Sequence, residues 1–543
     1  MNGALSLVES LQQLGAELVF GLPGVHNLAI WKALSESDIR LVSVRHEQTA
    51  VYAADGYART TGRLGVAVVT TGPGAANTLG ATGEAMASGS PVLVIATDIA
   101  SSLRREGVYG GTLHETRDQT AMFGPVTKAA RLVASADEIP SAVLESGSLA
   151  LAASSAPVYL GVPTNLLRKQ VSSDVPSLPS AAPVTPVPPE LLDEACRRLA
   201  QAERPLIWAG GGALRARAGP VIGDLALALS APVITTWLSR GLLPPDHPCA
   251  VPGPVHAEEV GALWDEADVV LAVGTDFDGT MTQNWQMPSP PTLIAVNLDE
   301  VEASKNYRSD VTLLGDARVV LEQLAPRVEY RGRVGALAQR LAGIGAQVSA
   351  FVEGDDEQAA RLLDVVHRAL PPEAVVVTDM CIPGYWLSGY WQVPRPRKLA
   401  YPLGWGTLGF GFPASLGAAL ADAGPTVCVC GDGGFMYACG ELATAVQERI
   451  PLTLVLVDDG GYGMLRFDQV QSGETPFGVD LVTPDFVALA SSFGVPACTV
   501  EGFGSDFERE LRDSIAGERP RMIVVHASLK PPPTTSPRWY RKR

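Results

Sequence analysis

The most constraining feature of this sequence is a pair of apolar runs that each lead into aspartate and glycine. Residues 427–430 lead into Gly-Asp-Gly-Gly at 431–434, and residues 453–457 lead into Asp459 and a second glycine-rich turn. The helical stretch 441–446 lies between them, so the order is strand, turn, helix, strand. A right-handed crossover of this kind puts both strand ends at one edge of a parallel sheet, where α/β proteins bind ligands. Two carboxylates beside glycine amides at a helix start predict a site for a divalent cation and a diphosphate.

Apolar strands alternate with helical stretches along the whole chain, the pattern of parallel sheets covered by helices on both faces. With 543 residues the chain is too long for one hydrophobic core and fits about three domains. We therefore expect an α/β protein with three doubly wound parallel-sheet domains, at residues 1–170, 190–346 and 358–530. The Pro- and Ser-rich residues 171–189 predict one linker, and a second is expected before the third domain. The first and last domains are candidates for a shared fold without shared sequence.

The charge balance and the apolar pattern argue against several classes of partner. A net charge of −17 disfavours binding to nucleic acid and to anionic membrane surfaces. No apolar run approaches about 20 residues, and the N-terminus lacks a basic segment with a cleavage site, so we expect a soluble, cytoplasmic protein. Seven cysteines without metal-like spacing agree with a reducing compartment. The basic residues 538–543 are expected to form a disordered tail.

The turn around Asp432 resembles the thiamine-diphosphate motif, which begins Gly-Asp-Gly and ends in an Asn that also binds Mg²⁺. Asp459 stands where that Asn is usual, so the resemblance implies Mg²⁺ held by Asp432, Asp459 and Gly461. The additional negative charge beside a diphosphate is expected to weaken cofactor binding or to make it depend more on metal concentration. Taken alone, a Gly-Asp-Gly triplet is equally consistent with a plain turn.

A second motif, near the N-terminus, extends the resemblance to the acetolactate synthase and benzaldehyde lyase-like 2-oxo acid decarboxylase family. Residues 45–59 resemble the start of the pyrimidine-binding domain, and Glu47 stands where a family Glu hydrogen-bonds N1′ of the aminopyrimidine. A carboxyl group at that atom stabilises the imino tautomer, whose nitrogen takes the proton from C2 of the thiazolium. Without the other motifs, Glu47 is interpreted as an ordinary acid at a helix start.

The third motif is a glycine-rich turn at residues 71–77, which follows an apolar strand. It resembles the family turn whose backbone lies against the aminopyrimidine. The resemblance implies cofactor contacts from Gly72, Pro73 and Asn77. A strand-to-helix loop in which Asn77 acts as a cap is the alternative.

The fourth motif, residues 404–413, resembles the family turn whose bulky apolar side chain bends the cofactor into a V shape. Leu408 stands where Met is usual, and the carbonyl of Gly406 is implied to accept the 4′-amino hydrogen. Residues 378–383 occupy a loop that normally contacts the diphosphate, but they lack its polar side chains, so the loop's backbone is expected to substitute. The remaining cofactor contacts that the resemblance implies are Cys381, Gly431, Gly433, Gly434, Tyr462, Gly463 and Met464.

Two histidines are implied to act near the reacting atoms. His26 lies in a strand-to-helix loop where acetolactate synthases carry a small apolar residue and benzaldehyde lyase-like enzymes carry His; a helix-capping His is the alternative. His114 replaces a family Gln, and the phrase at residues 113–119 resembles the guanidino-oxopentanoate decarboxylase branch. A neutral imidazole with a pKa near ~6.5 is suited to shuttling protons.

The resemblance also locates a substrate pocket. Asp468 stands where a Trp shapes the oxobutyrate pocket of acetolactate synthases, so a cationic or polar substrate is favoured, with an exposed surface Asp as an equal alternative. Val25 and Leu465 are implied as further lining residues.

The central domain gives no clear sign of a nucleotide. The glycine run 210–212 follows a strand, but close helix packing explains it as well as a dinucleotide would. Acetolactate synthases bind FAD through an Arg after a strand like residues 269–274. Here the strand leads into the acidic turn 275–278, so we expect FAD to be absent.

Together the motifs predict an enzyme that uses thiamine diphosphate and Mg²⁺ to decarboxylate a 2-oxo acid and join the remainder to a second carbonyl compound. Release of an aldehyde is the alternative reaction, and a non-catalytic regulatory homologue is the alternative of another class. By the resemblance, the three domains are the pyrimidine-binding, central Rossmann-like and diphosphate-binding domains. Active sites shared between subunits imply a homodimer or homotetramer.

Overall fold

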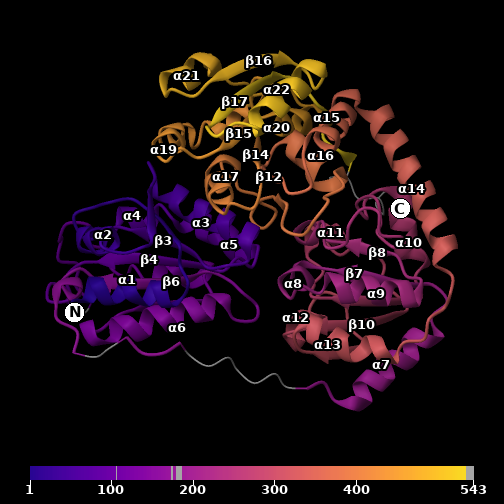
Figure 1. The fold of residues 1–543 in the computed structure, drawn as a ribbon, viewed down its shortest axis with the longest axis horizontal. Helices are drawn as coiled ribbons and strands as arrows, with labels where there is room; N and C mark the ends of the chain where they lie inside the picture. Colours follow the sequence, from indigo (N-terminus) through magenta and orange to yellow (C-terminus); the bar gives the residue numbers. More distant parts are fainter. Residues whose placement is uncertain (106, 173–174, 179–185, 534–543) are drawn as a thin grey trace.

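The computed structural model describes residues 1–105, 107–172, 175–178 and 186–533, and shows three lobes (Figure 1). Each lobe contains one parallel β-sheet with helices around it, so the expected α/β architecture of three parallel-sheet domains is confirmed. The linker expected at 171–189 lies partly outside the described residues, and the tail expected at 538–543 lies wholly outside them.

The N-terminal sheet has six strands in the order β2-β1-β3-β4-β6-β5, and every neighbouring pair is parallel. Four of these strands are almost entirely buried, as continuous apolar runs predict for a sheet covered on both faces. The strands are β1 (Leu18–Gly21), β2 (Arg40–Ser43), β3 (Gly65–Val69), β4 (Val92–Asp98), β5 (Ala129–Leu132) and β6 (Val158–Pro163). The helices are α1 (Gly3–Gln13), α2 (Leu28–Ser35), α3 (Glu47–Thr61), α4 (Pro73–Ala76), α5 (Leu79–Ala87) and α6 (Ile139–Leu151).

The central sheet has five parallel strands in the order β11-β10-β9-β7-β8. Read from the other edge, this is the doubly wound order of flavodoxin-like folds. The strands are β7 (Pro205–Ala209), β8 (Val233–Thr235), β9 (Val269–Val273), β10 (Thr292–Asn297) and β11 (Val311–Leu314). The helices are α7 (Pro189–Gln201), α8 (Gly211–Arg215), α9 (Gly219–Leu229), α10 (Glu258–Glu266), α11 (Gly279–Thr282), α12 (Glu300–Ser304), α13 (Ala317–Leu324) and α14 (Val334–Asp355).

The C-terminal sheet has six parallel strands in the order β13-β12-β14-β15-β17-β16, which repeats the strand order of the N-terminal sheet. The strands are β12 (Val375–Thr378), β13 (Leu399–Ala400), β14 (Thr426–Gly431), β15 (Leu452–Asp458), β16 (Ala497–Glu501) and β17 (Arg521–His526). The helices are α15 (Glu357–Ala369), α16 (Ile382–Tyr390), α17 (Gly411–Leu420), α18 (Asp432–Phe435), α19 (Leu442–Gln447), α20 (Gly463–Gln471), α21 (Phe486–Ser492) and α22 (Ser505–Ile515).

The second expected linker is wrong in one respect, because no loop separates the central and C-terminal domains. Helix α14 continues to Asp355 along the outside of the molecule, and α15 begins at Glu357 (Figure 1). Glycines in α14 obscured the helix in the sequence. Its apolar stripe, Leu341, Ile344, Val348 and Val352, has helical spacing and is buried, which is sufficient to hold the helix against the central domain.

The N- and C-terminal domains meet through α3 and α17, which approach closely because both carry glycine at the contact. A Cβ placed on Gly417 would lie 1.8 Å from the Ala53 carbonyl oxygen, and one on Gly56 would lie 2.0 Å from that of Ala414. Both helices are almost wholly buried. This helix pair fixes the two outer sheets relative to each other.

Close packing accounts for the glycine run of the central domain. A Cβ on Gly212 would lie 2.7 Å from Gly274 Cα, at the end of β9. The acidic turn after β9 is used locally: Asp276 pairs with Lys305 at 2.8 Å, and Asp278 caps α11 by accepting from the amides of residues 280 and 281. Within the described part of the chain, no helix is both long and apolar enough to cross a membrane.

Candidate active site

Asp432 and Asp459 lie together at the carboxyl edge of the C-terminal sheet. Strands β14 and β15 pair in parallel register up to Gly431 and Val457, so the residues that follow them emerge side by side. They face a cavity of about 120 Å³, which we call the carboxylate cavity. Its lining includes the predicted contacts Cys381, Leu408, Gly431, Asp432, Gly433, Gly434, Asp459, Gly461, Tyr462, Gly463 and Met464, with Leu465 of the predicted substrate pocket.

The two carboxylates of this cavity fit a divalent cation. Asp432 is buried, and its Oδ1 accepts from the Gly433 amide at 2.8 Å, whereas its Oδ2 is buried without a partner among the described residues. Burial, and then the charge of Asp459, raise the pKa of Asp432 to about 7. Burial also raises the pKa of Asp459, against the opposing effect of Arg466. A cation would satisfy the unpartnered oxygen and relieve the repulsion between the two carboxylates.

The second glycine-rich turn is shaped around Asp459. A Cβ on Gly463, at the start of α20, would lie 2.1 Å from Asp459 Oδ2, so no side chain is possible there without moving the carboxylate. Arg466 Nη1 donates to the Asp459 carbonyl at 3.2 Å, and its Nε pairs with Asp480 at 2.7 Å. The turn therefore presents Asp459 to the cavity from a braced backbone.

The turn that carries Leu408 is held by a buried carboxylate that the sequence analysis missed. Asp379 accepts from the Gly409 amide at 3.0 Å and from the Gly411 amide at 3.3 Å, and burial raises its pKa to about 6. Leu408 lines the carboxylate cavity, while Gly406 lies outside the lining in a left-handed conformation with φ 67°. Asp379 lies within the loop 378–383, but no local sequence pattern indicates that it faces another turn.

Glu47 begins α3 in the N-terminal domain and is 9% exposed. Its Oε2 accepts from Asn77 Nδ2 at 3.0 Å, which brings together two of the predicted cofactor contacts. The segment before it is held by Glu441 of the C-terminal domain, which accepts from the amides of Arg45 and His46 at 3.0 Å each. Glu441 is a second positioning residue that the sequence analysis missed, because the contact spans two domains.

The turn at Gly72 and Pro73 lies directly after β3. Gly72 has φ 64°, and a Cβ there would lie 2.3 Å from the carbonyl oxygen of His114. Gln119 Oε1 accepts from the Gly72 amide at 2.6 Å, and its Nε2 donates to the Thr97 carbonyl at 2.8 Å. Gln119 lies in the same segment as His114 and is the residue that fixes the turn, although no sequence motif marks it.

His26 and His114 are brought together, although they are far apart in the sequence. Their ring centroids are 5.2 Å apart with the planes at 81°, an edge-to-face arrangement. The Nδ1 atoms of both are buried without a partner among the described residues. Burial, and then His114, lower the pKa of His26, while Asp98 opposes this effect. His26 is therefore neutral at pH 7, and the Nδ1 atoms of His26 and His114 are both available for a hydrogen bond.

Three predicted residues of the substrate pocket lie on the surface of the chain. Val25 is 62% exposed beside His26, and Leu465 is 51% exposed at the mouth of the carboxylate cavity. Asp468 is exposed on α20 and does not line that cavity. Among the described residues, the lining of the carboxylate cavity comes only from the C-terminal domain, so Glu47, Gly72, Asn77, His26 and His114 form a separate N-terminal cluster.

Comparisons with known proteins match three successive segments of the chain. Three family profiles of thiamine pyrophosphate enzymes match the chain: the N-terminal TPP binding domain at residues 1–122, the central domain at 192–324 and the C-terminal TPP binding domain at 380–525.

Relatives that match along most of their length include enzymes of two named groups. A probable 2-ketoarginine decarboxylase of Pseudomonas aeruginosa is 37% identical over 94% of this chain and 91% of its own length. A probable acetolactate synthase large subunit of Methanocaldococcus jannaschii is 29% identical over 97% and 92%, and an acetolactate synthase of Mycobacterium bovis is 30% identical over 91% and 83%. The chain belongs to the thiamine pyrophosphate enzymes, within the group that includes acetolactate synthases and related 2-oxo acid decarboxylases.

Proposed function

We propose that the carboxylate cavity binds Mg²⁺ and the diphosphate of thiamine diphosphate. Asp432, Asp459 and the carbonyl of Gly461 would hold the cation, and the amides of Gly433 and Gly434 would face the diphosphate. The buried, unpartnered Oδ2 of Asp432 is the observation that supports this assignment. The other predicted contacts that line this cavity would surround the same diphosphate.

The N-terminal cluster would supply the proton transfers. When bound, thiamine diphosphate supplies a carbon nucleophile for the 2-oxo group and an electron sink that allows CO₂ to leave. Glu47 would hold a proton at N1′ of the aminopyrimidine, and Asn77, hydrogen-bonded to its Oε2, would orient the carboxyl group.

A second copy of the chain would complete each site. The single chain keeps its N-terminal cluster outside the carboxylate cavity. Large apolar side chains are exposed beside both parts: Val25 and Leu113 near the N-terminal cluster, and Tyr437 and Leu465 near the cavity. Exposed apolar residues grouped in this way mark a protein interface. A homodimer, or a tetramer built from it, would place the cluster of one subunit over the cavity of its partner.

The reaction that this arrangement favours is decarboxylation of a 2-oxo acid with release of an aldehyde. The carrying observation is the pair His26 and His114, whose buried, unpartnered nitrogen atoms provide a proton donor and acceptor beside the Gly72 turn. After CO₂ is lost, a proton delivered to the remaining carbon gives the aldehyde. Carboligation to a second carbonyl compound is the second candidate, and the similarity to acetolactate synthases favours it.

The substrate side chain is proposed to be polar or cationic. A groove that shares Asp459 and Gly463 with the carboxylate cavity is also lined by Asp355, Asp356 and Glu357, and these carboxylates outnumber its two cations, Arg466 and Lys530. Burial is the main cause of the raised pKa of Tyr385, and the charge of Asp468 on α20 adds a smaller contribution. These carboxylates favour a cation at the far end of the substrate, in agreement with the name of the 2-ketoarginine decarboxylase relative.

The test is a panel of 2-oxo acids with pyruvate, 2-oxobutanoate and 2-ketoarginine, scored for CO₂ and for products by mass spectrometry. We expect stoichiometric CO₂ and aldehyde, with the highest kcat/KM for 2-ketoarginine. A 2-hydroxy-2-alkyl-3-oxo acid as the main product would establish the carboligase instead. If thiamine diphosphate binds neither the wild type nor its refolded form, the non-catalytic homologue becomes the better explanation.

A further inference from the structure

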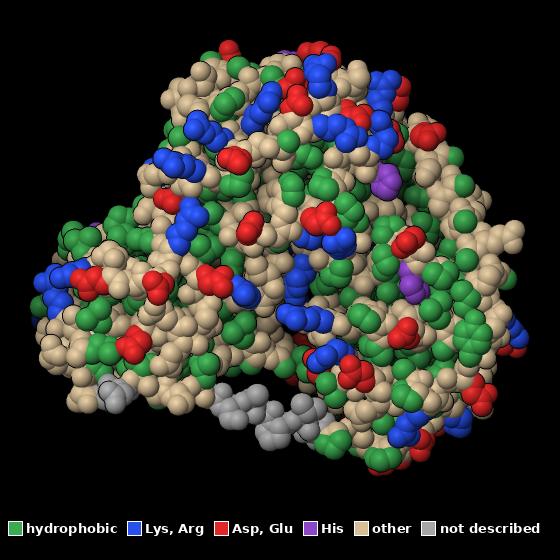
Figure 2. Space-filling view, in the orientation of Figure 1, with side chains coloured by type: hydrophobic (Ala, Val, Ile, Leu, Met, Phe, Trp, Pro, Cys, Tyr) green, Lys and Arg blue, Asp and Glu red, His purple; other side chains and the backbone are tan. Residues whose placement is uncertain are grey.

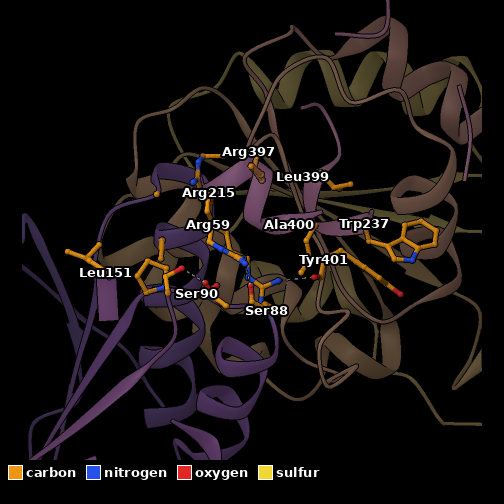
Figure 3. A pocket seen from close by; sticks show the side chains of 18 residues that line it. Arg59, Ser88, Ser90, Leu151, Arg215, Trp237, Arg397, Leu399, Ala400 and Tyr401 are labelled. Atoms are coloured by element: carbon orange, nitrogen blue, oxygen red, sulfur yellow. Dashed lines mark hydrogen bonds between the residues drawn. The ribbon is translucent and has the colours of Figure 1, made fainter. Parts of the chain in front are cut away.

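A second cavity lies where the three domains meet, and we call it the junction cavity. It has a volume of about 140 Å³ and is walled by α3 and the turn before β4, by α8 of the central domain, and by the segment around β13. Figure 3 shows its side chains, and in Figure 2 basic side chains gather at the junction of the lobes. None of the predicted cofactor contacts is among the described residues that line it.

One arginine of this cavity is fully paired. Arg59 bonds Asp55 at 2.7 Å and Glu84 at 3.1 Å, and its Nη1 donates to the Tyr401 carbonyl at 2.8 Å. Both carboxylates are buried, so their charges are used within the protein. Arg59 is therefore a structural part of the cavity wall. Because Asp55 and Glu84 already pair with it, neither carboxylate is available to the other arginines of the cavity.

Two further arginines lack such partners. Arg215 Nη1 donates to the Ser88 carbonyl at 3.4 Å, and Arg397 Nη1 donates to the Arg59 carbonyl at 3.1 Å. Within the described residues, neither forms an ion pair. Figure 3 shows the Arg215 and Arg397 side chains close together at one end of the cavity. Asp276, the acid whose charge acts on Arg215, pairs with Lys305.

The pKa values of Arg215 and Arg397 both lie below the usual value for arginine. Burial, and then Arg397, lower the pKa of Arg215 to about 10. Burial, and then Arg217, lower the pKa of Arg397. Arg215 nevertheless remains charged at pH 7 and its side chain is exposed to solvent, whereas Arg397 is half-buried. Two adjacent cations without a counterion repel each other, and an anion bound between them would remove that repulsion.

The walls are shaped around the two guanidinium groups. A Cβ on Gly62 would lie 2.9 Å from Arg397 Cζ, and one on Gly89 would lie 2.9 Å from Arg215 Nη1. Ser90, which also lines the cavity, has no hydrogen bond from its hydroxyl group to another described residue. The glycines admit the guanidinium groups, and the serine adds a neutral donor beside them.

We propose that the junction cavity binds a phosphate-sized oxyanion, held by Arg215 of the central domain and Arg397 of the C-terminal domain against the N-terminal domain. Paired guanidinium forks match the oxygen geometry of a phosphate group. The volume suits a small ion, since sites for drug-sized ligands measure about 300–1,000 Å³. Because residues from all three domains surround the ion, its binding would stabilise their relative placement.

The position of the site connects it with the Leu408 turn. Glu84, the partner of Arg59, also accepts from the amides of Gly404 at 3.3 Å and Trp405 at 2.9 Å. Tyr401, which lines the junction cavity, leads into the same turn. Stabilising the junction would therefore also steady the start of that turn.

The test is a calorimetric and thermal-melt titration of the enzyme with inorganic phosphate, in the presence of saturating thiamine diphosphate and Mg²⁺ and at constant ionic strength. We expect saturable binding of about one phosphate per chain and a rise in Tm that chloride does not reproduce. A phosphate monoester such as glycerol 3-phosphate forms a second arm. Tighter binding of the monoester identifies the phosphate group of a metabolite, and tighter binding of phosphate identifies the free ion.

Variants locate the site. Arg215→Gln and Arg397→Gln are each expected to weaken phosphate binding at least about tenfold, as expected for a charge-assisted pair. Both should fold, because each change removes an unpaired cation. Arg215→Lys keeps the charge but loses the fork and should bind with intermediate affinity. Arg318→Gln, at an exposed arginine on α13, is the matched control and should bind phosphate as the wild type does.

The proposal is overturned if the wild type shows no saturable phosphate binding. It is also overturned if both Gln variants bind phosphate with the affinity of the wild type. Phosphate binding in the carboxylate cavity would give this result, and it would be recognised by loss of bound thiamine diphosphate as phosphate is added.

Discussion

The N- and C-terminal domains have the same strand order, but their glycine-rich turns carry different chemical groups. The third strand of each sheet, β3 and β14, ends in a glycine-rich turn and a four-residue helix, α4 or α18. In the first domain the turn carries Pro73, and in the last it carries Asp432. The equivalent helices α3 and α17, which follow the second strand of each sheet, pack against each other.

The shared strand order fixes where each site lies, and the residues of the turn decide what the site does. Both domains present their turns at the carboxyl edge of a parallel sheet, as doubly wound folds do. The N-terminal turn is held by neutral Gln119, beside two imidazoles, and suits an aromatic ring and proton transfer. The C-terminal turn ends in buried carboxylates and suits a cation. One architecture would thus provide the two proposed half-sites by changing a few residues.

The strongest test of this division is Glu47→Gln in the N-terminal cluster. An amide cannot share a proton with N1′ as a carboxyl group does, so activity should fall by about 10²–10⁴-fold while thiamine diphosphate still binds. Deuterium exchange at C2 of the bound cofactor measures the step directly. Exchange at the wild-type rate would remove Glu47 from the proposed mechanism.

Asp432→Ala should produce the converse result. The change removes one of about six oxygen ligands and a full charge, so retention of thiamine diphosphate should fall by about 100-fold. Calorimetric titration of the cofactor at fixed Mg²⁺ is the measurement. Wild-type affinity in this variant would move the cation away from the carboxylate cavity.

The helix pair that relates the two domains can be broken at Gly417. A methyl group there would meet the Ala53 carbonyl oxygen, so Gly417→Ala should destabilise the protein by about 1–3 kcal/mol. Chemical denaturation followed by circular dichroism tests this. Gly440→Ala, at a glycine whose added Cβ meets nothing within 4 Å, is the control and should change stability little.

Asp459→Asn sharpens the comparison in the other direction, because it removes charge while keeping a ligand oxygen. Removal of one negative charge at about 4 Å from a diphosphate is worth roughly 1–4 kcal/mol, which is enough for a tenfold or larger change in affinity, so thiamine diphosphate should bind as tightly as in the wild type or more tightly. The Mg²⁺ requirement, read from a metal titration, should fall. If this variant loses the cofactor as completely as Asp432→Ala, Asp459 has a role other than ligation.

The smallest expected effect concerns His26 and pH. Its pKa in the folded chain lies below the usual 6.5, so the unfolded chain takes up the proton first as the pH falls. The corresponding stability is present above pH 6.5 and is lost below it. His26→Gln should therefore show a smaller fall in Tm between pH 7.5 and 5.5 than the wild type. An equal fall in both proteins would place the acid sensitivity elsewhere.

The sequence by itself determined the parallel sheets and the strand ends at Asp432 and Asp459, and it predicted the residues proposed for both half-sites. These follow from local patterns, since apolar runs, glycine-rich turns and the residues after them are read within a few positions. The same local rules failed for α14, where glycines hid a helix that is held by packing of its apolar stripe against the central domain.

Only the tertiary structure decided which distant residues meet. The edge-to-face contact of His26 with His114, the hold of Glu441 on the start of α3, and the link from Asp379 to Gly409 all join segments with no common sequence pattern. The junction cavity is the clearest case, because Arg215 and Arg397 come from different domains. A side chain's electrostatic role depends on which charges fold near it, and that distance is set by the packing of whole domains.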